Sequence, residues 1–381
     1  MTGLAMHPDL APLVNPRLAL LEPAGVRGRP RQRARDARLE RRHGGEFRVA
    51  VCAPFGGAEG IWGPSCLAAA RLAQGELNRG SGIAGRPGEL QVVDASVQAV
   101  DVDRLLADMA EDGAIDAVVG MCISSVRQRI VRALGGRIPF VYTCLYEGGD
   151  TAPGLYAIGE TAARQLTPSI AWLAGHARAR RWMLVGNDYV WPRVSHRLAR
   201  RCIADSGGAV VAETFLPFGV DDFSQVIDTL RRTRADAVLI SMVGQDAVEF
   251  NRAFARAGLA RRVRRLSCAI EENQLLAIGA ENTDELYAAL GYFAALPTDA
   301  NQAFKERYHA RFGDRAPVLN SIGQSLYEGM HFLAALLDDA APARPRGYAS
   351  ARLADTAGGP GEAPIYLARA DGHQFSVLTR F

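Results

Sequence analysis

The stretch GNDYVWPR, residues 186–193, decides how the rest of the chain is interpreted. The apolar run RWMLV at residues 181–185 precedes it and has the length of a buried strand. A helical pattern follows it, and Pro192 suits the first turn of that helix. Tyr189 and Trp191 therefore come just past the carboxyl end of a strand, where open α/β sheets bind ligands. Both aromatics would also fit core positions at a strand–helix corner.

Strands and helices alternate on both sides of this stretch. Short apolar runs that are typical of strands occupy residues 47–53, 90–94, 117–121, 138–142, 210–214, 237–241, 265–269 and 290–294. Helical patterns separate them, including one at about 168–175 before the central stretch. Such alternation predicts parallel sheets with right-handed crossovers. The predicted fold is α/β, with two doubly wound parallel-sheet lobes joined by a hinge and a ligand cleft between them.

The chain is long enough for two domains of ordinary size, because it has 381 residues. We expect a disordered basic arm, a first α/β lobe, a second α/β lobe, helices that return to the first lobe and hinge, and a loop with a C-terminal hairpin. These five segments span residues 1–45, 46–165, 166–295, 296–340 and 341–381. The hairpin prediction rests on two apolar runs that flank Asp371-Gly372, which favours a tight turn.

Charge gives little sign of a nucleic-acid partner. The net charge is only +3, so we expect no direct nucleic-acid binding by the folded lobes. Residues 27–43 are nevertheless strongly basic. This arm fits a solvated, disordered segment, a start codon assigned too early, or a contact with nucleic acid or an anionic surface.

The cysteines and the N-terminus bear on the compartment. None of the six cysteines forms a C-x-x-C pair, and no Cys/His spacing fits a zinc site, so we expect no metal and no cofactor. Most of the cysteines lie in apolar runs, which suits a reducing compartment, although an even number leaves disulfides open. Residues 1–25 lack the pattern of a secretory signal. We therefore expect a cytoplasmic protein, or a periplasmic one if the start is misassigned.

A glycine-rich loop at residues 54–64 follows the first predicted strand. It lacks both the dinucleotide-binding spacing G-x-G-x-x-G and the phosphate-binding pattern G-x-x-x-x-G-K-[ST]. Its backbone N–H groups still stand at the start of a helix, where Ser65 is a plausible N-cap. This loop can therefore hydrogen-bond a polar ligand.

Several segments together resemble the type I periplasmic-binding-protein family, of the branched-chain amino-acid-binding kind. Within that family the chain is most similar to the amide- and urea-binding branch. The matching segments are residues 58–65, 78–87, 119–125, 142–148 and 186–193. The resemblance covers about three quarters of the chain, and the stretch at 186–193 is its most specific motif.

The resemblance implies a small polar ligand clamped between lobes by hinge closure, with no chemistry performed on it. Family members act as receptors of ATP-driven ABC importers, and one branch senses amides in the cytoplasm for an antitermination regulator. The partner would then be the membrane subunits of a transporter or such a regulator, and a homodimer is an open alternative. The implied ligand-binding residues are Ile61, Trp62, Cys122, Ser124, Ser125, Tyr142, Cys144, Tyr146, Tyr189, Trp191, Gly244, Gln245 and Glu271.

Two cysteines depart from the amide branch. Cys122 stands where that branch often has tyrosine, and Cys144 stands where it often has threonine. Both changes make the pocket less polar, so a less polar amide or a short carboxylate becomes comparable with acetamide or urea. Amino-acid receptors of the family hold an α-amino group with an acidic residue. Asp188, Glu271 and Glu272 are candidates, although the last two would also fit a solvated loop.

Two other classes of function stay open. An enzyme on this fold would use Cys144 as a nucleophile and would need a histidine beside it. The histidine nearest the central motif, His196, falls on a helix, and we expect it to be exposed. The other alternative is an interaction protein that binds no small ligand. We expect a binding protein and not an enzyme.

Overall fold

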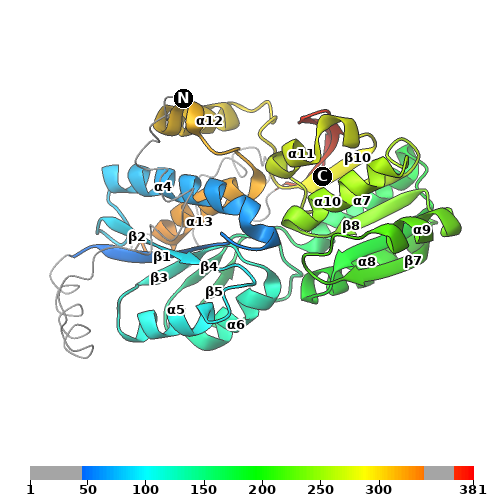
Figure 1. Ribbon diagram of the computed structural model, residues 1–381. Helices are drawn as coiled ribbons and strands as arrows, with labels where there is room; N and C mark the ends of the chain where they lie inside the picture. The colour runs from blue at the N-terminus through cyan, green and yellow to red at the C-terminus, as the bar shows by residue number, and fades with distance from the viewer. Residues whose placement is uncertain (1–44, 339–363) are drawn as a thin grey trace, which may run out of the picture.

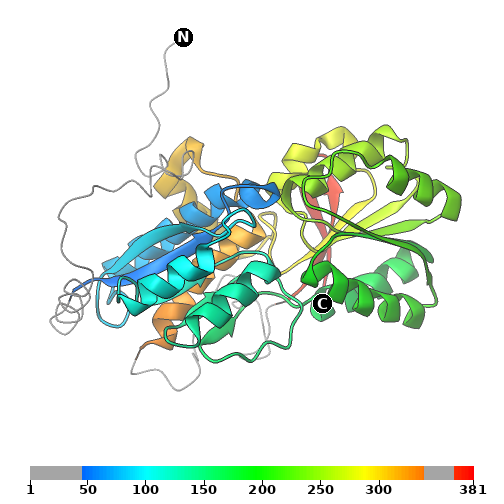
Figure 2. The ribbon, with the colours of Figure 1, turned by 60° about the horizontal axis from the view of Figure 1, so that its bottom comes forward.

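Two α/β lobes lie side by side in the computed structural model, which describes residues 45–338 and 364–381 (Figure 1). Each lobe is built around one sheet, and helices cover both faces of that sheet (Figure 2). The two-lobed α/β architecture predicted from the sequence is confirmed. In the described residues no helix is both long enough and apolar enough to cross a bilayer.

The first lobe carries a five-stranded sheet in the order β2-β1-β3-β4-β5, and every pair of neighbours is parallel. Its strands are β1 (Phe47–Ala53), β2 (Gly88–Asp94), β3 (Ala117–Gly120), β4 (Phe140–Tyr142) and β5 (Leu155–Ala157). Its helices are η2 (Ala58–Trp62), α4 (Gly63–Arg79), α5 (Val102–Glu111) and α6 (Ser124–Leu134). The near-continuous apolar strands are explained by this arrangement, because helices cover the sheet on both faces.

The second lobe carries a seven-stranded sheet in the order β12-β11-β10-β9-β8-β6-β7. Its parallel strands are β6 (Arg181–Asn187), β7 (Ala209–Leu216), β8 (Ala237–Ser241), β9 (Arg264–Ser267) and β10 (Leu286–Leu290). Its helices are α7 (Ala162–His176), α8 (Val190–Asp205), α9 (Ser224–Thr233), α10 (Gly244–Arg256), α11 (Glu272–Ile278) and η3 (Ala280–Asn282).

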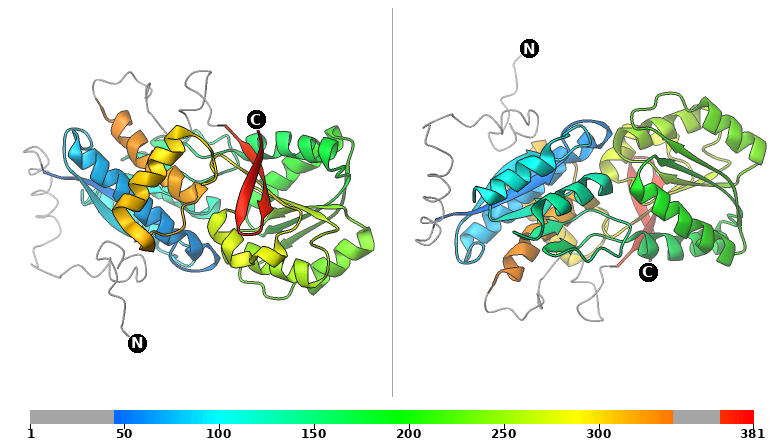
Figure 3. Two further views of the ribbon diagram at one scale, coloured as in Figure 1. Left: turned by 90° about the horizontal axis from the view of Figure 1, so that it is seen from above. Right: turned by 90° about the horizontal axis from the view of Figure 1, so that it is seen from below.

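The C-terminal residues complete both lobes. Helix α13 (Ser321–Leu336) packs on α4, β3 and β4 of the first lobe, and α12 (Asp299–Phe312), which is followed by η4 (Gly313–Arg315), also contacts α4. Strands β11 (Tyr366–Asp371) and β12 (Gln374–Arg380) form an antiparallel hairpin that joins β10 of the second sheet. Seen from above, this hairpin lies on the side of the second sheet nearest the first lobe (Figure 3). The described chain crosses between the lobes at residues 158–161 and 291–298.

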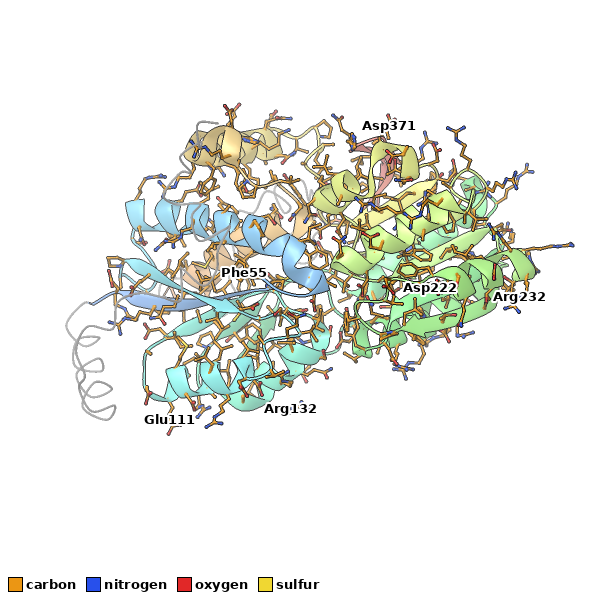
Figure 4. The ribbon with its side chains drawn as sticks, in the orientation of Figure 1. Phe55, Glu111, Arg132, Asp222, Arg232 and Asp371 are labelled. Atoms are coloured by element: carbon orange, nitrogen blue, oxygen red, sulfur yellow. The ribbon has the colours of Figure 1, made fainter. Side chains whose placement is uncertain are left out.

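Most buried side chains are apolar and lie between the sheets and their helices. Labelled charged residues on the outer surfaces, such as Glu111, Arg132 and Arg232, point away from the two interiors (Figure 4). The six cysteines are all free and buried, which fits small apolar core positions.

Some local predictions were wrong. The strand expected at residues 290–294 is instead β10, which ends at Leu290, and the apolar residues that follow form the buried crossing between lobes. The helix expected from about residue 168 begins at Ala162 and contains Pro168 in its interior. Ser65 is not the N-cap of α4, because that helix begins at Gly63 with Trp62 as N-cap. The arm at residues 1–44 and most of the loop after 341 lie outside the described residues.

The expectation that His196 is exposed was also wrong. Its side chain is fully buried, stacks on Phe215 with ring centroids 4.8 Å apart, and has Nδ1 3.1 Å from Oε1 of Glu213. Burial lowers the pKa of His196 to about 4, although Glu213 acts in the opposite direction. A neutral histidine on this helix therefore serves the core of the second lobe.

Candidate functional site

A cavity lies between the lobes, where the strands of both sheets end. In this closed form the cavity has a volume of about 20 Å³, which is room for about one water molecule. This is far below the ~300–1,000 Å³ of small-molecule sites, so a solute requires the two walls to move apart. Both lobes supply side chains to it, and most of these are apolar or aromatic. The lining residues are Trp62, Met121, Cys122, Ile123, Ser124, Tyr142, Cys144, Leu145, Tyr189, Trp191, Val243, Ala269 and Ile322.

The first-lobe wall comes from two strand ends and two helix starts. Strand β3 ends at Gly120 and leads through Cys122 to Ser124, the first residue of α6. Strand β4 ends at Tyr142, whose hydroxyl donates to the backbone carbonyl of Cys122 at 2.8 Å. This bond holds the two strand ends together and commits the tyrosine proton to the protein. Trp62 and Ile322 stand at the starts of α4 and α13.

The second-lobe wall comes from the ends of β6, β8 and β9. Tyr189 is the N-cap residue of α8 and Trp191 follows in its first turn. The Tyr189 ring lies 6.3 Å from the Trp191 ring and 5.4 Å from that of Phe218, measured between centroids. Val243 and Ala269 complete this wall. Aromatic rings with fixed neighbours provide a rigid apolar surface.

The lining carries no charge near neutral pH. Burial raises the pKa of Tyr142 and Tyr189 well above the ordinary tyrosine value. Burial likewise raises the pKa of the Cys122 and Cys144 thiols. These four are the titratable side chains of the lining, so all of them stay protonated and neutral. A ligand here meets apolar walls and hydrogen-bonding groups, and it meets no ionised side chain.

Two indole N–H groups are the most informative polar atoms at the cavity. The side chains of Trp62 and Trp191 are each 2% exposed, and their Nε1 atoms have no hydrogen-bond partner among the described residues. An indole nitrogen can only donate. A buried donor without an acceptor costs about 1–3 kcal/mol, so a ligand oxygen placed there would relieve that cost. One donor comes from each lobe.

Helix starts add further donors around the cavity. Trp62, Ile123, Tyr189 and Val243 are the N-cap residues of α4, α6, α8 and α10, and all four line the cavity. None of these helices has a side chain that caps its first N–H groups. The first turn of a helix has N–H groups without intrahelical acceptors and a partial positive charge. The site therefore favours a ligand with acceptor oxygens.

The lobes touch beside the cavity. Gly244 begins α10 with φ +54°, and a Cβ atom there would lie 1.8 Å from the carbonyl oxygen of Ala58 in η2. The side chain of Asn273 in the second lobe donates to the carbonyl oxygen of Ile61 in the first lobe at 3.0 Å. Closed lobes are thus part of the geometry that encloses the cavity.

Seven of the sequence-predicted site residues line the cavity. They are Trp62, Cys122, Ser124, Tyr142, Cys144, Tyr189 and Trp191. They come together because each one follows a strand end or begins a helix at the edge where the two sheets face each other.

The other six predicted residues do not line the cavity. Ile61 contributes its carbonyl to the contact between lobes, and Ser125 lies one residue beyond the lining on α6. Tyr146 stands behind Tyr142, with ring centroids 6.3 Å apart. Gln245 is exposed, and its Nε2 donates to Glu249 at 2.9 Å.

Gly244 and Glu271 have structural roles at the same edge. Gly244 allows the close backbone contact with η2 described above. Glu271 is fully buried and forms a capping box with Gln274 at the start of α11. Its Oε2 also accepts the N–H of Ile322 at 3.1 Å, so this carboxylate ties the second lobe to α13.

Sequence reasoning missed the remaining lining residues. Four of them adjoin a predicted site residue in sequence and were not predicted because their side chains are apolar: Met121, Ile123, Leu145 and Val243. Ala269 lies just past the end of β9, on the predicted edge. Ile322 comes from a helix that is distant in sequence from the other segments, and no local signal marks it.

The thiol of Cys144 does not have the setting of a nucleophile. Burial raises its pKa, and the nearby carboxylate of Glu271 acts in the same direction. A reactive cysteine requires a lowered pKa and a basic neighbour. The lining described above includes no histidine.

A family model described as "Periplasmic binding protein" matches residues 46–375. The chain belongs to this family. It is of the type I, branched-chain amino-acid-binding kind predicted from the sequence motifs. Members of the family bind solutes and are not enzymes as a class, which agrees with the setting of Cys144.

Solved structures of other family members share the fold. A solute-binding protein of an ABC transporter from Rhodopseudomonas palustris HaA2, in complex with p-hydroxybenzoic acid, is 17% identical with a TM-score of 0.76 and covers 88% of this chain and 97% of its own. A branched-chain amino-acid-binding protein from Streptococcus pneumoniae, in complex with isoleucine, is 15% identical with a TM-score of 0.73 and covers 88% and 98%. A substrate-binding protein from Sphaerobacter thermophilus is 21% identical with a TM-score of 0.71 and covers 88% and 98%. At such identities the likeness concerns the fold.

Proposed function

We propose that this protein binds a small, mainly apolar solute with a carbonyl-type head group and delivers it to an ABC importer. The observation that carries the proposal is the interlobe cavity, which has apolar walls and a buried, unpartnered indole N–H from each lobe among the described residues. Short amides, ureas and amino-acid-like molecules fit this description. Aromatic acids also fit it. A solved relative above is in complex with p-hydroxybenzoic acid, and another is in complex with the amino acid isoleucine.

Hinge closure is the proposed mechanism of binding. The solute would enter between separated lobes and would then be enclosed as η2 meets the start of α10. Ligand oxygens would accept from Trp62 and Trp191, and the rings of Tyr142 and Tyr189 would cover the apolar part. Because the two indoles belong to different lobes, the bound solute itself would favour the closed form.

The membrane subunits of an importer are the proposed partner, and the periplasm is the proposed compartment in place of the cytoplasm expected from the sequence. The antitermination regulator and the homodimer were also expected as alternatives. The family to which the chain belongs supports the importer over these alternatives.

A thermal-shift screen tests the proposal. The panel contains short amides, ureas, nitriles, branched-chain amino acids and benzoates. A solute present at 100 times its dissociation constant should stabilise the fold by about 2.7 kcal/mol. Tyr189→Ala should abolish the shift, and Gln245→Ala, which changes an exposed residue outside the cavity, should preserve it. The proposal fails if folded, ligand-free protein responds to none of these solutes.

A further inference from the structure

Among the lining residues, Ser124 carries an aliphatic hydroxyl group, and the proton of this hydroxyl already forms a hydrogen bond within the protein. The side chain is 2% exposed and lines the cavity. Its Oγ donates to Oε2 of Glu147 at 2.7 Å. An ionised carboxylate can only accept, and a serine hydroxyl has one proton. Ser124 therefore presents lone pairs, and not a donor, to whatever occupies the cavity.

Glu147 is held in this position by a buried arginine. Nη2 of Arg127 donates to Oε1 of Glu147 at 2.7 Å and lies 3.3 Å from Asp150. Arg127 is 1% exposed, and its guanidinium lies 5.0 Å from the ring centroid of Tyr142 and 5.3 Å from that of Tyr146. The pair is fixed behind the tyrosine wall, because the guanidinium cannot turn away without leaving both rings.

A donor stands beside this acceptor. Ser124 is the first residue of α6, and no side chain caps the start of this helix. The N–H groups of a first turn have no intrahelical acceptor. The serine therefore combines an accepting Oγ with a donating N–H. That pairing matches a head group with a carbonyl oxygen next to an N–H or O–H, whereas a carboxylate would put a second acceptor against Oγ.

We propose that Glu147 is a positioning residue that fixes Ser124 as an acceptor, and that the site thereby selects solutes with a donor beside the carbonyl oxygen over the matching carboxylates. This inference rests on the proposed function, since it names the head group of the same solute. Arg127 supports the selection indirectly by holding Glu147.

Matched pairs of probes test the selection. Isobutyramide and isobutyrate, benzamide and benzoate, and isovaleramide and isovalerate differ only in the head group. Titration calorimetry on the full chain should show each amide that binds to be preferred over its carboxylate by about tenfold or more, because the carboxylate leaves an unfavourable contact at Ser124. Glu147→Gln should reduce the preference to threefold or less, because its side-chain NH₂ can donate to Ser124 and release the serine proton.

Two further variants distinguish the effect of the Ser124 hydroxyl from charge repulsion by Glu147 and from the loss of an acidic partner of Arg127. Ser124→Ala retains the Glu147 charge, and it should also reduce the preference to threefold or less. Asp150→Asn removes the other acid beside Arg127 and should keep the wild-type preference. If Glu147→Gln does not fold, as judged by circular dichroism, the comparison of Ser124→Ala with Asp150→Asn still decides.

Specific outcomes overturn the inference. It is wrong if carboxylates bind wild type as tightly as their amides, or if Ser124→Ala keeps the full preference. Binding by no pair, and by no other solute of the thermal-shift panel, would instead overturn the proposed function and this inference with it. Tighter binding of the carboxylates than of their amides would overturn this inference and leave the proposed function standing.

Discussion

The two walls of the cavity differ in whether their buried polar side chains bond to a polar side chain of the lining. In the first lobe, Arg127 donates to Glu147, and Glu147 accepts the hydroxyl proton of Ser124 at the lining. In the second lobe, Asn187 donates to Asp246 at 2.7 Å and accepts the N–H of Val243 at 2.9 Å, so this network holds the backbone of a lining residue and adds no side-chain polar group to the lining. The first lobe is therefore built to distinguish the head group, and the second is a mainly apolar cover whose polar groups are the Trp191 N–H, the Tyr189 hydroxyl and the starts of α8 and α10.

The largest expected effect comes from preventing the two walls from meeting. Gly244→Ala places a Cβ against the carbonyl oxygen of Ala58 across the lobes, so the closed form becomes sterically blocked. We expect solute affinity to fall by more than about 100-fold, equivalent to about 2.7 kcal/mol. Titration calorimetry measures the affinity, and small-angle scattering should show a larger radius of gyration.

Gly258→Ala is the matched control for that variant. Gly258 has φ +73°, and no atom lies within 4 Å of its potential Cβ. It therefore carries the same left-handed backbone strain of about 1 kcal/mol without the contact between lobes. If Gly258→Ala weakened binding as much as Gly244→Ala does, closure would not be the cause.

The contact between the walls also contains a buried carboxylate. Glu59 in η2 is 1% exposed, and burial raises its pKa to about 7. Asp246 and Asp94 add to the rise, although the backbone N–H groups of Glu59 and Val97 lower the pKa. Since the folded protein holds this proton more tightly than the unfolded chain, the stabilisation is complete below about pH 4.5 and is lost as the pH rises toward 7.

Glu59→Gln should remove that pH dependence. Relative to the variant, wild type should lose roughly 2–3 kcal/mol of unfolding free energy between pH 4.5 and 7.5, with little further change above. Denaturant unfolding of both proteins at pH 5, 6, 7 and 8 gives the difference. A difference that is the same at pH 5 and pH 8 would show that Glu59 titrates normally.

The indole donors give a smaller, paired test. Trp191→Phe and Trp62→Phe each remove one N–H and keep an aromatic ring, so each should weaken solute binding about tenfold. The ligand-free variants should be no less stable than expected from the smaller ring, because the lost donors have no acceptor among the described residues. An unchanged affinity in either variant would show that the indole on that wall does not contact the solute.

The smallest effect is expected at Gln245. This side chain is exposed and contacts Glu249 on its own helix, although the sequence placed it in the site. Gln245→Ala should change solute affinity by less than twofold. A larger change would mean that the start of α10 reaches the solute, and the cover would then be less apolar than described.

The sequence predicted the architecture well because parallel α/β lobes carry strong local signals. Apolar runs such as residues 181–185 lie on buried strands, and strand ends mark the ligand edge regardless of exact boundaries. The failures lie where burial alone does not determine the local structure. Tyr292 and Phe293 are fully buried in a crossing between lobes, and their apolar pattern resembles that of a strand.

Within the site, the aromatic and polar residues could be predicted from the sequence, but the hydrogen-bond partners of the polar side chains could not. The sequence marked Ser124 as a ligand-binding residue without saying whether its hydroxyl donates or accepts, and its proton goes to Glu147, a residue 23 positions away. It marked Glu271 as a ligand contact, whereas this carboxylate caps α11 and accepts from Ile322. Glu147 and Ile322 are distant in sequence from their partners, and no spacing rule reports such contacts, whereas the three-residue spacing of Glu271 and Gln274 is that of a capping box.

A crystal structure of the protein with the solute that gives the largest thermal shift tests the central claim most directly. We expect closed lobes, with the solute between Tyr142 and Trp191 and its oxygen atoms within about 3 Å of an indole nitrogen from each lobe. A solute bound outside this cavity, or bound to one lobe with both indole nitrogens unpartnered, would contradict it.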